Sequence, residues 1–90
     1  MIEKKFLITH DLGLHAKYAT LLVQKCNQFN AKITLTCKKL TADFKSIMGV
    51  MALGVSKADV IVIDADGYDE EEAIKQISLE LTDNMIAKEI

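Results

Sequence analysis

The chain has 90 residues, half of them hydrophobic, and a net charge of −2 at neutral pH. A chain of this length fits one small domain spanning residues 1–90, and it buries only about 60 to 65% of its unfolded surface. The fold should therefore be simple. No run of Lys or Arg exceeds two residues, which argues against a nucleic-acid footprint or a polybasic membrane patch. Proteins and small anions remain as the expected partners.

The N-terminal residues predict neither a secretory signal nor a membrane anchor. Acidic and basic residues occur within the first five positions, and no small-residue cleavage site follows them. The apolar run Val60–Ile63 is far too short to span a bilayer. We expect a soluble, cytoplasmic protein without membrane insertion.

Cys26 and Cys37 are expected to be reduced, buried and structural. They form no CxxC pair, and no histidine is spaced to complete a zinc site with them. His10 and His15 stand five apart across a glycine loop without a neighbouring cysteine, so no metal and no other cofactor is predicted.

The first elements in chain order are a strand and a helix. Residues 2–9 alternate between apolar and polar and predict a half-buried strand. A loop over 10–14 follows, in which Gly13 can adopt backbone angles that other residues avoid. Helical spacing then predicts a helix from Ala16 to about residue 28, with Asn27 or Asn30 as its stop. The helix would therefore begin directly after His15.

The middle of the chain predicts a hairpin and a short helix. Residues 31–37 show the cleanest period of two, Lys38 and Lys39 form the turn, and a third strand begins at Leu40, which is expected to face inward with Ala42 and Phe44. Ser46 would cap a short helix, and Gly54 would end it. That helix is too apolar for one narrow stripe, so part of its surface should be exposed; the candidates are Ile47, Met48 and Met51.

The last elements are a strand and a helix. Residues 59–65 predict a strand that is apolar on both faces. Asp69 would cap a helix that runs to about residue 84, and the final residues are expected to fray. The order β-α-β-β-α-β-α indicates an α+β fold, with three helices on one face of a four-stranded antiparallel sheet.

His15 is the first candidate site. The stretch Gly13–Thr20 places it between a glycine loop and a helix start, where free backbone N–H groups and the helix dipole favour an anion. A nucleophilic imidazole in that position could take up a phosphoryl group and hold it beside those donors. A lone histidine could equally fill or cap the loop.

Ser46 is the second candidate site. A hydroxyl at a helix N-cap usually satisfies backbone donors. A phosphate there would be stabilised by the helix dipole and would block a surface without unfolding the helix. Exposed Met48 and Met51 would suit the docking of several partners.

Two separated motifs, Gly13–Thr20 and Lys45–Met51, together with Phe6, Leu53–Gly54 and Gly67, resemble the histidine-containing phosphocarrier protein HPr of the bacterial phosphoenolpyruvate-dependent sugar phosphotransferase system. The resemblance covers almost the whole chain. It implies an HPr-like open-faced β-sandwich with sheet order 1-4-2-3.

The resemblance implies a function for each motif. His15 would accept a phosphoryl group on Nδ1 from phosphorylated enzyme I and pass it to IIA domains of sugar permeases. Ala16, Lys17 and Tyr18 would hold the phosphate. Ser46 resembles the serine that HPr kinase/phosphorylase modifies in low-GC Gram-positive bacteria. The phosphorylated form would act as corepressor of the catabolite control protein, and the implied docking residues are Ile47, Met48, Met51 and Thr20.

The chain departs from the family at the centre of the first motif. The family continues from the histidine as Ala-Arg-Pro, whereas Lys17 and Tyr18 stand here, and Leu12 replaces a common Ser or Asn. Lysine keeps the charge but lacks the planar fork of donors that grips a phosphate. These departures predict altered transfer kinetics or an altered partner.

Two functions remain open at this level. The first is a phosphoryl carrier, which is a substrate of other enzymes and catalyses nothing itself, because no second catalytic group is spaced to assist His15. The second is a Ser46-switched regulatory module of carbon catabolite repression with little or no carrier activity. The presence of His15 favours the carrier, whereas Leu12, Lys17 and Tyr18 favour the module.

Overall fold

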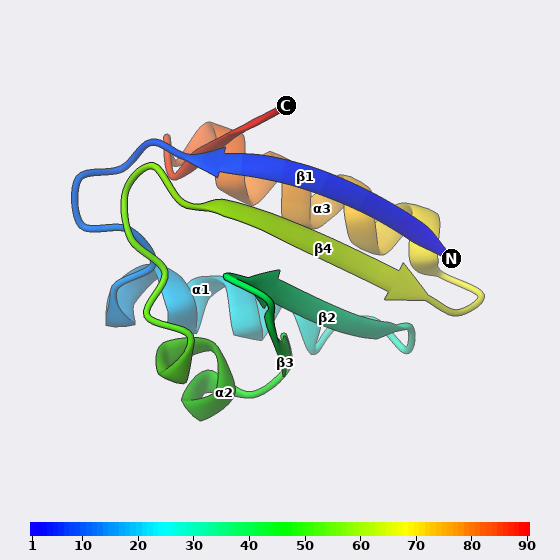
Figure 1. The fold of residues 1–90 in the computed structure, drawn as a ribbon. Coiled ribbons are helices and arrows are strands. Elements are labelled where there is room, and N and C mark those ends of the chain that lie inside the picture. Colours follow the sequence, from blue (N-terminus) through cyan, green and yellow to red (C-terminus); the bar gives the residue numbers. More distant parts are fainter.

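The computed structural model describes residues 1–90 and contains five strands and three helices. Figure 1 shows their arrangement, and the chain order is β1 (Ile2–Ile8), α1 (Ala16–Cys26), β2 (Lys32–Cys37), β3 (Leu40–Asp43), α2 (Ile47–Ala52), β4 (Val60–Asp66), α3 (Glu70–Asp83) and β5 (Ala87–Glu89). Helices α1 and α3 cover one side of the sheet, and α2 packs against α1 and β3. The predicted order of the first seven elements is confirmed.

The sheet has five strands in the order β3-β2-β4-β1-β5, and all neighbours are antiparallel. The implied order 1-4-2-3 is present within it, but the expectation of four strands is wrong. Successive side chains of a strand point to opposite faces of the sheet, so every second side chain points toward the layer of helices. Those side chains are buried, and they include Phe6, Ile8, Ile33, Leu35, Ile61 and Ile63.

The fifth strand corrects the expectation that the C-terminus frays. β5 pairs with Phe6–Ile8 of β1, and Ile86, directly before it, is fully buried. The Ile86 carbonyl accepts hydrogen bonds from Thr9 N–H at 2.9 Å and His10 N–H at 3.2 Å. Met85 turns the chain into this strand with φ at 55°, a conformation that non-glycine residues seldom adopt. The C-terminal residues therefore hold the end of β1.

The hairpin between β2 and β3 turns at Lys38 and Lys39, as predicted. Their φ angles of 53° and 68° are those that a two-residue hairpin turn requires, although neither residue is glycine or asparagine. The inward position expected for Leu40 is wrong, since this side chain is 60% exposed. β3 is an edge strand, and Leu40 pairs with Cys37 at its first residue, directly after the exposed turn of Lys38 and Lys39.

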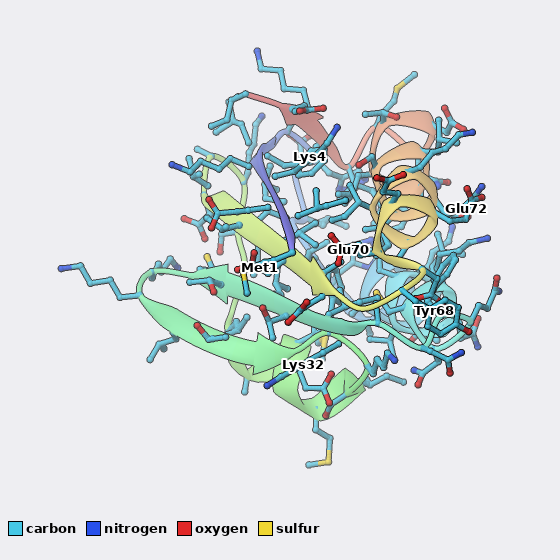
Figure 2. All side chains as sticks on the ribbon, turned by 90° about the vertical axis from the view of Figure 1, so that its right-hand side faces the viewer. Met1, Lys4, Lys32, Tyr68, Glu70 and Glu72 are labelled. Carbon is cyan, nitrogen blue, oxygen red and sulfur yellow. The ribbon has the colours of Figure 1, made fainter.

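The start of α3 differs from the prediction in its hydrogen bonds. Asp69 occupies the predicted N-cap position, but its side chain does not cap the helix; its carboxylate accepts the N–H groups of Asn30 and Ala31, both at 2.8 Å. The Asn30 N–H is the main reason that the pKa of Asp69 lies below its usual range. Glu70 instead accepts Gly67 N–H at 3.1 Å and pairs with the N-terminal ammonium at 2.7 Å (Figure 2). Asp69 thus ties α3 to the start of β2.

We expect Ile86→Ala to lower the free energy of unfolding by about 2 to 5 kcal/mol, because it leaves a cavity in the core, where Ile86 is fully buried. Ile90→Ala is the matched control, since Ile90 is 61% exposed, and should change it by no more than about 0.5 kcal/mol. Urea unfolding measures both. Equal small effects would show that the C-terminal residues fray after all.

Candidate functional site

His15 occupies the position directly before the first turn of α1. Its backbone is extended, with φ at −70° and ψ at 171°, and its carbonyl accepts the Ala19 N–H at 2.9 Å. The half-buried imidazole does not cap the helix, and neither ring nitrogen bonds to another residue. Both nitrogens are therefore open to a ligand.

A close backbone approach fixes this position. Gly13 has φ at 60°, and a Cβ atom on it would lie 2.3 Å from the Val55 carbonyl oxygen. The same oxygen accepts the Leu14 N–H at 3.2 Å, and the Leu14 side chain is buried in the core. Only glycine fits at residue 13, and Leu14 anchors the chain just before His15.

The first turn of α1 offers unpaired backbone donors. The N–H groups of Ala16, Lys17 and Tyr18 have no intrahelical acceptor, no side chain of the protein accepts from them, and the turn contains no acidic residue. The positive end of the helix dipole adds to this field. The arrangement suits an anion bound next to the His15 ring.

The charged groups around the site are exposed. The Lys17 ammonium lies 5.7 Å from the centroid of the Tyr18 ring, and no carboxylate pairs with it. Asp11 pairs with Lys57 at 2.7 Å, and the hydrogen bond from Lys57 lowers the pKa of Asp11. Leu12 is 68% exposed and offers no donor from its side chain.

Three rings meet at the site and form what we term the ring cluster: His10, His15 and Tyr18. The centroid of the His15 ring lies 4.6 Å from that of Tyr18 and 5.6 Å from that of His10, and the rings of His10 and Tyr18 meet edge to face at 4.9 Å. From the sequence, His10 is considered only as a metal ligand. No spacing pattern in the sequence links His10 to His15, because their contact depends on how the loop between them folds.

Ser46 lies at the start of α2, where its hydroxyl accepts the Gly49 N–H at 3.1 Å. This confirms the predicted N-cap. Lys45, beside it, donates from its ammonium to the Phe29 carbonyl at 2.7 Å, which ties the loop before α2 to the segment between α1 and β2. The Ser46 side chain is half-buried.

The predicted exposure of α2 is confirmed. Met48 is 84% exposed, Ile47 43% and Met51 42%, whereas Val50 faces the core. Thr20 lies half-buried on α1, against which α2 packs. We term Ile47, Met48 and Met51 the methionine patch.

The two cysteines are free and buried, as expected. Burial raises the pKa of the Cys26 thiol to about 12 and also raises that of Cys37, so neither is a thiolate at neutral pH. No three His, Cys, Asp or Glu side chains gather into a group that could hold a metal ion. The helices are all too short or too polar to cross a membrane.

Comparison with known proteins identifies the family. Residues 2–83 match the family model described as the PTS HPr component phosphorylation site. The histidine-containing phosphocarrier protein of Mycoplasma is 32% identical over 97% of this chain and 99% of its own, with a TM-score of 0.94. HPr from Thermoanaerobacter tengcongensis is 40% identical over 93% of each chain, with a TM-score of 0.86.

A third similar structure is named for a role in catabolite repression. Crh, the catabolite repression protein of Bacillus subtilis, is 32% identical over 92% of this chain and 95% of its own, with a TM-score of 0.72. Its fold is shared, while its name points to regulation. The match along residues 2–83, together with these structures, shows that the chain belongs to the HPr family of phosphocarrier proteins of the phosphotransferase system.

Proposed function

We propose that the protein carries a phosphoryl group on His15, taking it from phosphorylated enzyme I and giving it to IIA domains of sugar permeases. The observation that supports this most is a ring with two unbonded nitrogens at a helix start whose first-turn N–H groups are free. The N–H groups of Ala16, Lys17 and Tyr18 would bind the phosphoryl oxygens. The protein would be a substrate of its partners and catalyse nothing alone.

The transfer needs only what this site and its donor provide. The lone pair of a His15 nitrogen attacks phosphorus, a new P–N bond forms, and the bond to the donor breaks with its electron pair left on the donor. The proton of the imidazole stays on the other ring nitrogen. Negative charge on the transferred group meets the start of α1, where no carboxylate opposes it.

Incubation with phosphoenolpyruvate and a purified enzyme I should add one phosphate, detected by intact mass. The phosphate should be acid-labile, as a phosphorus–nitrogen bond is, and it should be absent from the His15→Ala variant. A working reference HPr serves as the positive control. A chain that stays unmodified while the reference is labelled would contradict the carrier function with this enzyme I.

Lys17 and Tyr18 are the positions that we expect to limit the rate. Arginine at residue 17 would present two parallel donors to a phosphate, whereas the Lys17 ammonium is a single flexible point charge. Tyr18 packs against the hydrophobic core and lies against the His15 ring, so its bulk stands beside the surface that a partner must approach.

The double variant Lys17→Arg, Tyr18→Pro should raise the rate of transfer from a standard enzyme I by up to about tenfold, the value of one charged hydrogen bond. Rapid-quench measurement of phosphorylated protein gives the rate. Lys75→Arg, on the exposed surface of α3, is the matched control and should leave it unchanged. An unchanged rate in the double variant would show that these positions are not limiting.

A second function, regulation through Ser46, has its own support. The methionine patch lies exposed beside the half-buried hydroxyl, and the chain is similar to Crh. HPr kinase/phosphorylase would modify Ser46, and the phosphorylated face would bind the catabolite control protein. Phosphate at the start of α2 would alter this surface without unfolding the helix.

Kinase and ATP should add one acid-stable phosphate that Ser46→Ala abolishes. The phosphorylated protein should then bind the catabolite control protein, and Met48→Ala should weaken binding at least about fivefold, as for a central interface side chain. Met85→Ala is the control, because Met85 is similarly exposed at 78% but lies before β5. Equal effects of the two variants, measured by titration calorimetry, would argue against docking on the methionine patch.

A further inference from the structure

His10 is the second histidine of the ring cluster, and hydrogen bonds within the loop fix its position. Its backbone N–H donates to the Ile86 carbonyl, and its own carbonyl accepts the Gly13 N–H at 3.0 Å. Its ring is bonded as well, since Nδ1 accepts the Leu12 N–H at 3.1 Å. Two backbone hydrogen bonds therefore fix the position of His10 in the loop, and one hydrogen bond to Nδ1 orients its ring.

The bond from Leu12 also assigns the proton of the His10 ring. A neutral imidazole that accepts at Nδ1 must carry its proton on Nε2. Nε2 is then an N–H donor that bonds to no other residue of the chain. For the same reason His10 is a poor nucleophile, because neither nitrogen presents a free lone pair, whereas both nitrogens of His15 are unbonded.

The distance between the two histidines suits a phosphoryl group. The ring centroids of His10 and His15 are 5.6 Å apart, with the planes tilted by 44°. A phosphoryl group on His15 lengthens that side chain by one P–N bond and one P–O bond. Its oxygens would then come within reach of the His10 ring, where an N–H donor to a phosphate forms a strong charge-assisted bond.

We propose that His10 is a phosphate-positioning residue, which donates a hydrogen bond from Nε2 to the phosphoryl group on His15. The proposal rests on the proposed carrier function of His15. It gives the site a donor that neither the Leu12 side chain nor the flexible Lys17 ammonium supplies in fixed geometry. His10 would thereby stabilise the phosphorylated state of the protein.

Two variants separate the hydrogen bond from ring packing. His10→Phe keeps a ring next to Tyr18 and His15 but has no donor, whereas His10→Gln loses the ring and keeps an amide donor at a similar distance from the backbone. With phosphoenolpyruvate and enzyme I, His10→Phe should lower the equilibrium ratio of phosphorylated to free protein about tenfold. His10→Gln should retain most of that ratio. The opposite order would show that His10 acts by packing and would overturn the proposal.

Nitrogen-15 NMR of the His10 ring tests the proposed hydrogen bond independently of the variants. Before phosphorylation the ring should be in the Nε2–H tautomer, and after phosphorylation of His15 the Nε2–H resonance should move while Nδ1 stays. A ring whose resonances do not respond would also overturn the proposal.

Phosphoramidate, a chemical donor that labels exposed histidines without an enzyme, distinguishes the two proposals. If enzyme I fails but phosphoramidate labels His15, the carrier function with enzyme I fails, and the NMR measurement still tests His10. Mass spectrometry of the His15→Ala variant checks that the label is on His15. A His15 that takes phosphate from neither donor would overturn both proposals.

Discussion

The contact between the backbones of Gly13 and Val55 is the constraint on which the site depends. The Val55 oxygen lies where the Cβ of any other residue at position 13 would have to be, and it also accepts the Leu14 N–H. Two segments about forty residues apart in sequence therefore meet without an intervening side chain. This contact buries Leu14, and it places His15 outside the core at the first residue before α1.

The first turns of α1 and α3 differ in the negative charge that they place at the positive end of the helix dipole. The first turn of α3 contains Glu70, Glu71 and Glu72, so the protein itself supplies the negative charge that this end favours. The first turn of α1 contains none, and its N–H groups have no acceptor within the chain. The free N–H groups at the start of α1, beside an unbonded imidazole, would bind an anion more favourably than they bind water. This contrast leaves the start of α1, rather than that of α3, free to take up an anion.

Most of the fold could be predicted because its pattern is regular. Alternation defined the strands, and helical spacing defined α1 and α3 to within two residues. The failures have local causes. β5 is three residues long, which is too short to show an alternation of apolar and polar residues. It also depends on the left-handed backbone conformation of Met85, which no feature of the sequence predicts. Asp69 has the sequence signature of a cap, but the N–H groups of Asn30 and Ala31 compete successfully for its carboxylate.

Two residues of the candidate site could be predicted from the sequence, but a third could not. His15 and Ser46 stand in motifs of adjacent residues, so the sequence alone indicated both. His10 belongs to the site through a loop that folds back, and no spacing rule brings a strand end into contact with a helix start. Contacts of this kind depend on the closure of the loop by Gly13, which becomes visible only in three dimensions.

The unusual residues of this site form a physically consistent group. Leu12 contributes its backbone N–H to His10 and no side-chain donor, and Tyr18 brings a ring where the family has proline. That ring packs edge to face on His10, an arrangement that aromatic pairs favour. Under the proposed carrier function, His10 and the first turn of α1 would supply part of the hydrogen bonding that an arginine and a hydroxyl would otherwise give to the phosphate. His10 would thereby replace only part of the hydrogen bonding that the departures from the family motif remove, and an arginine at residue 17 would still strengthen phosphate binding.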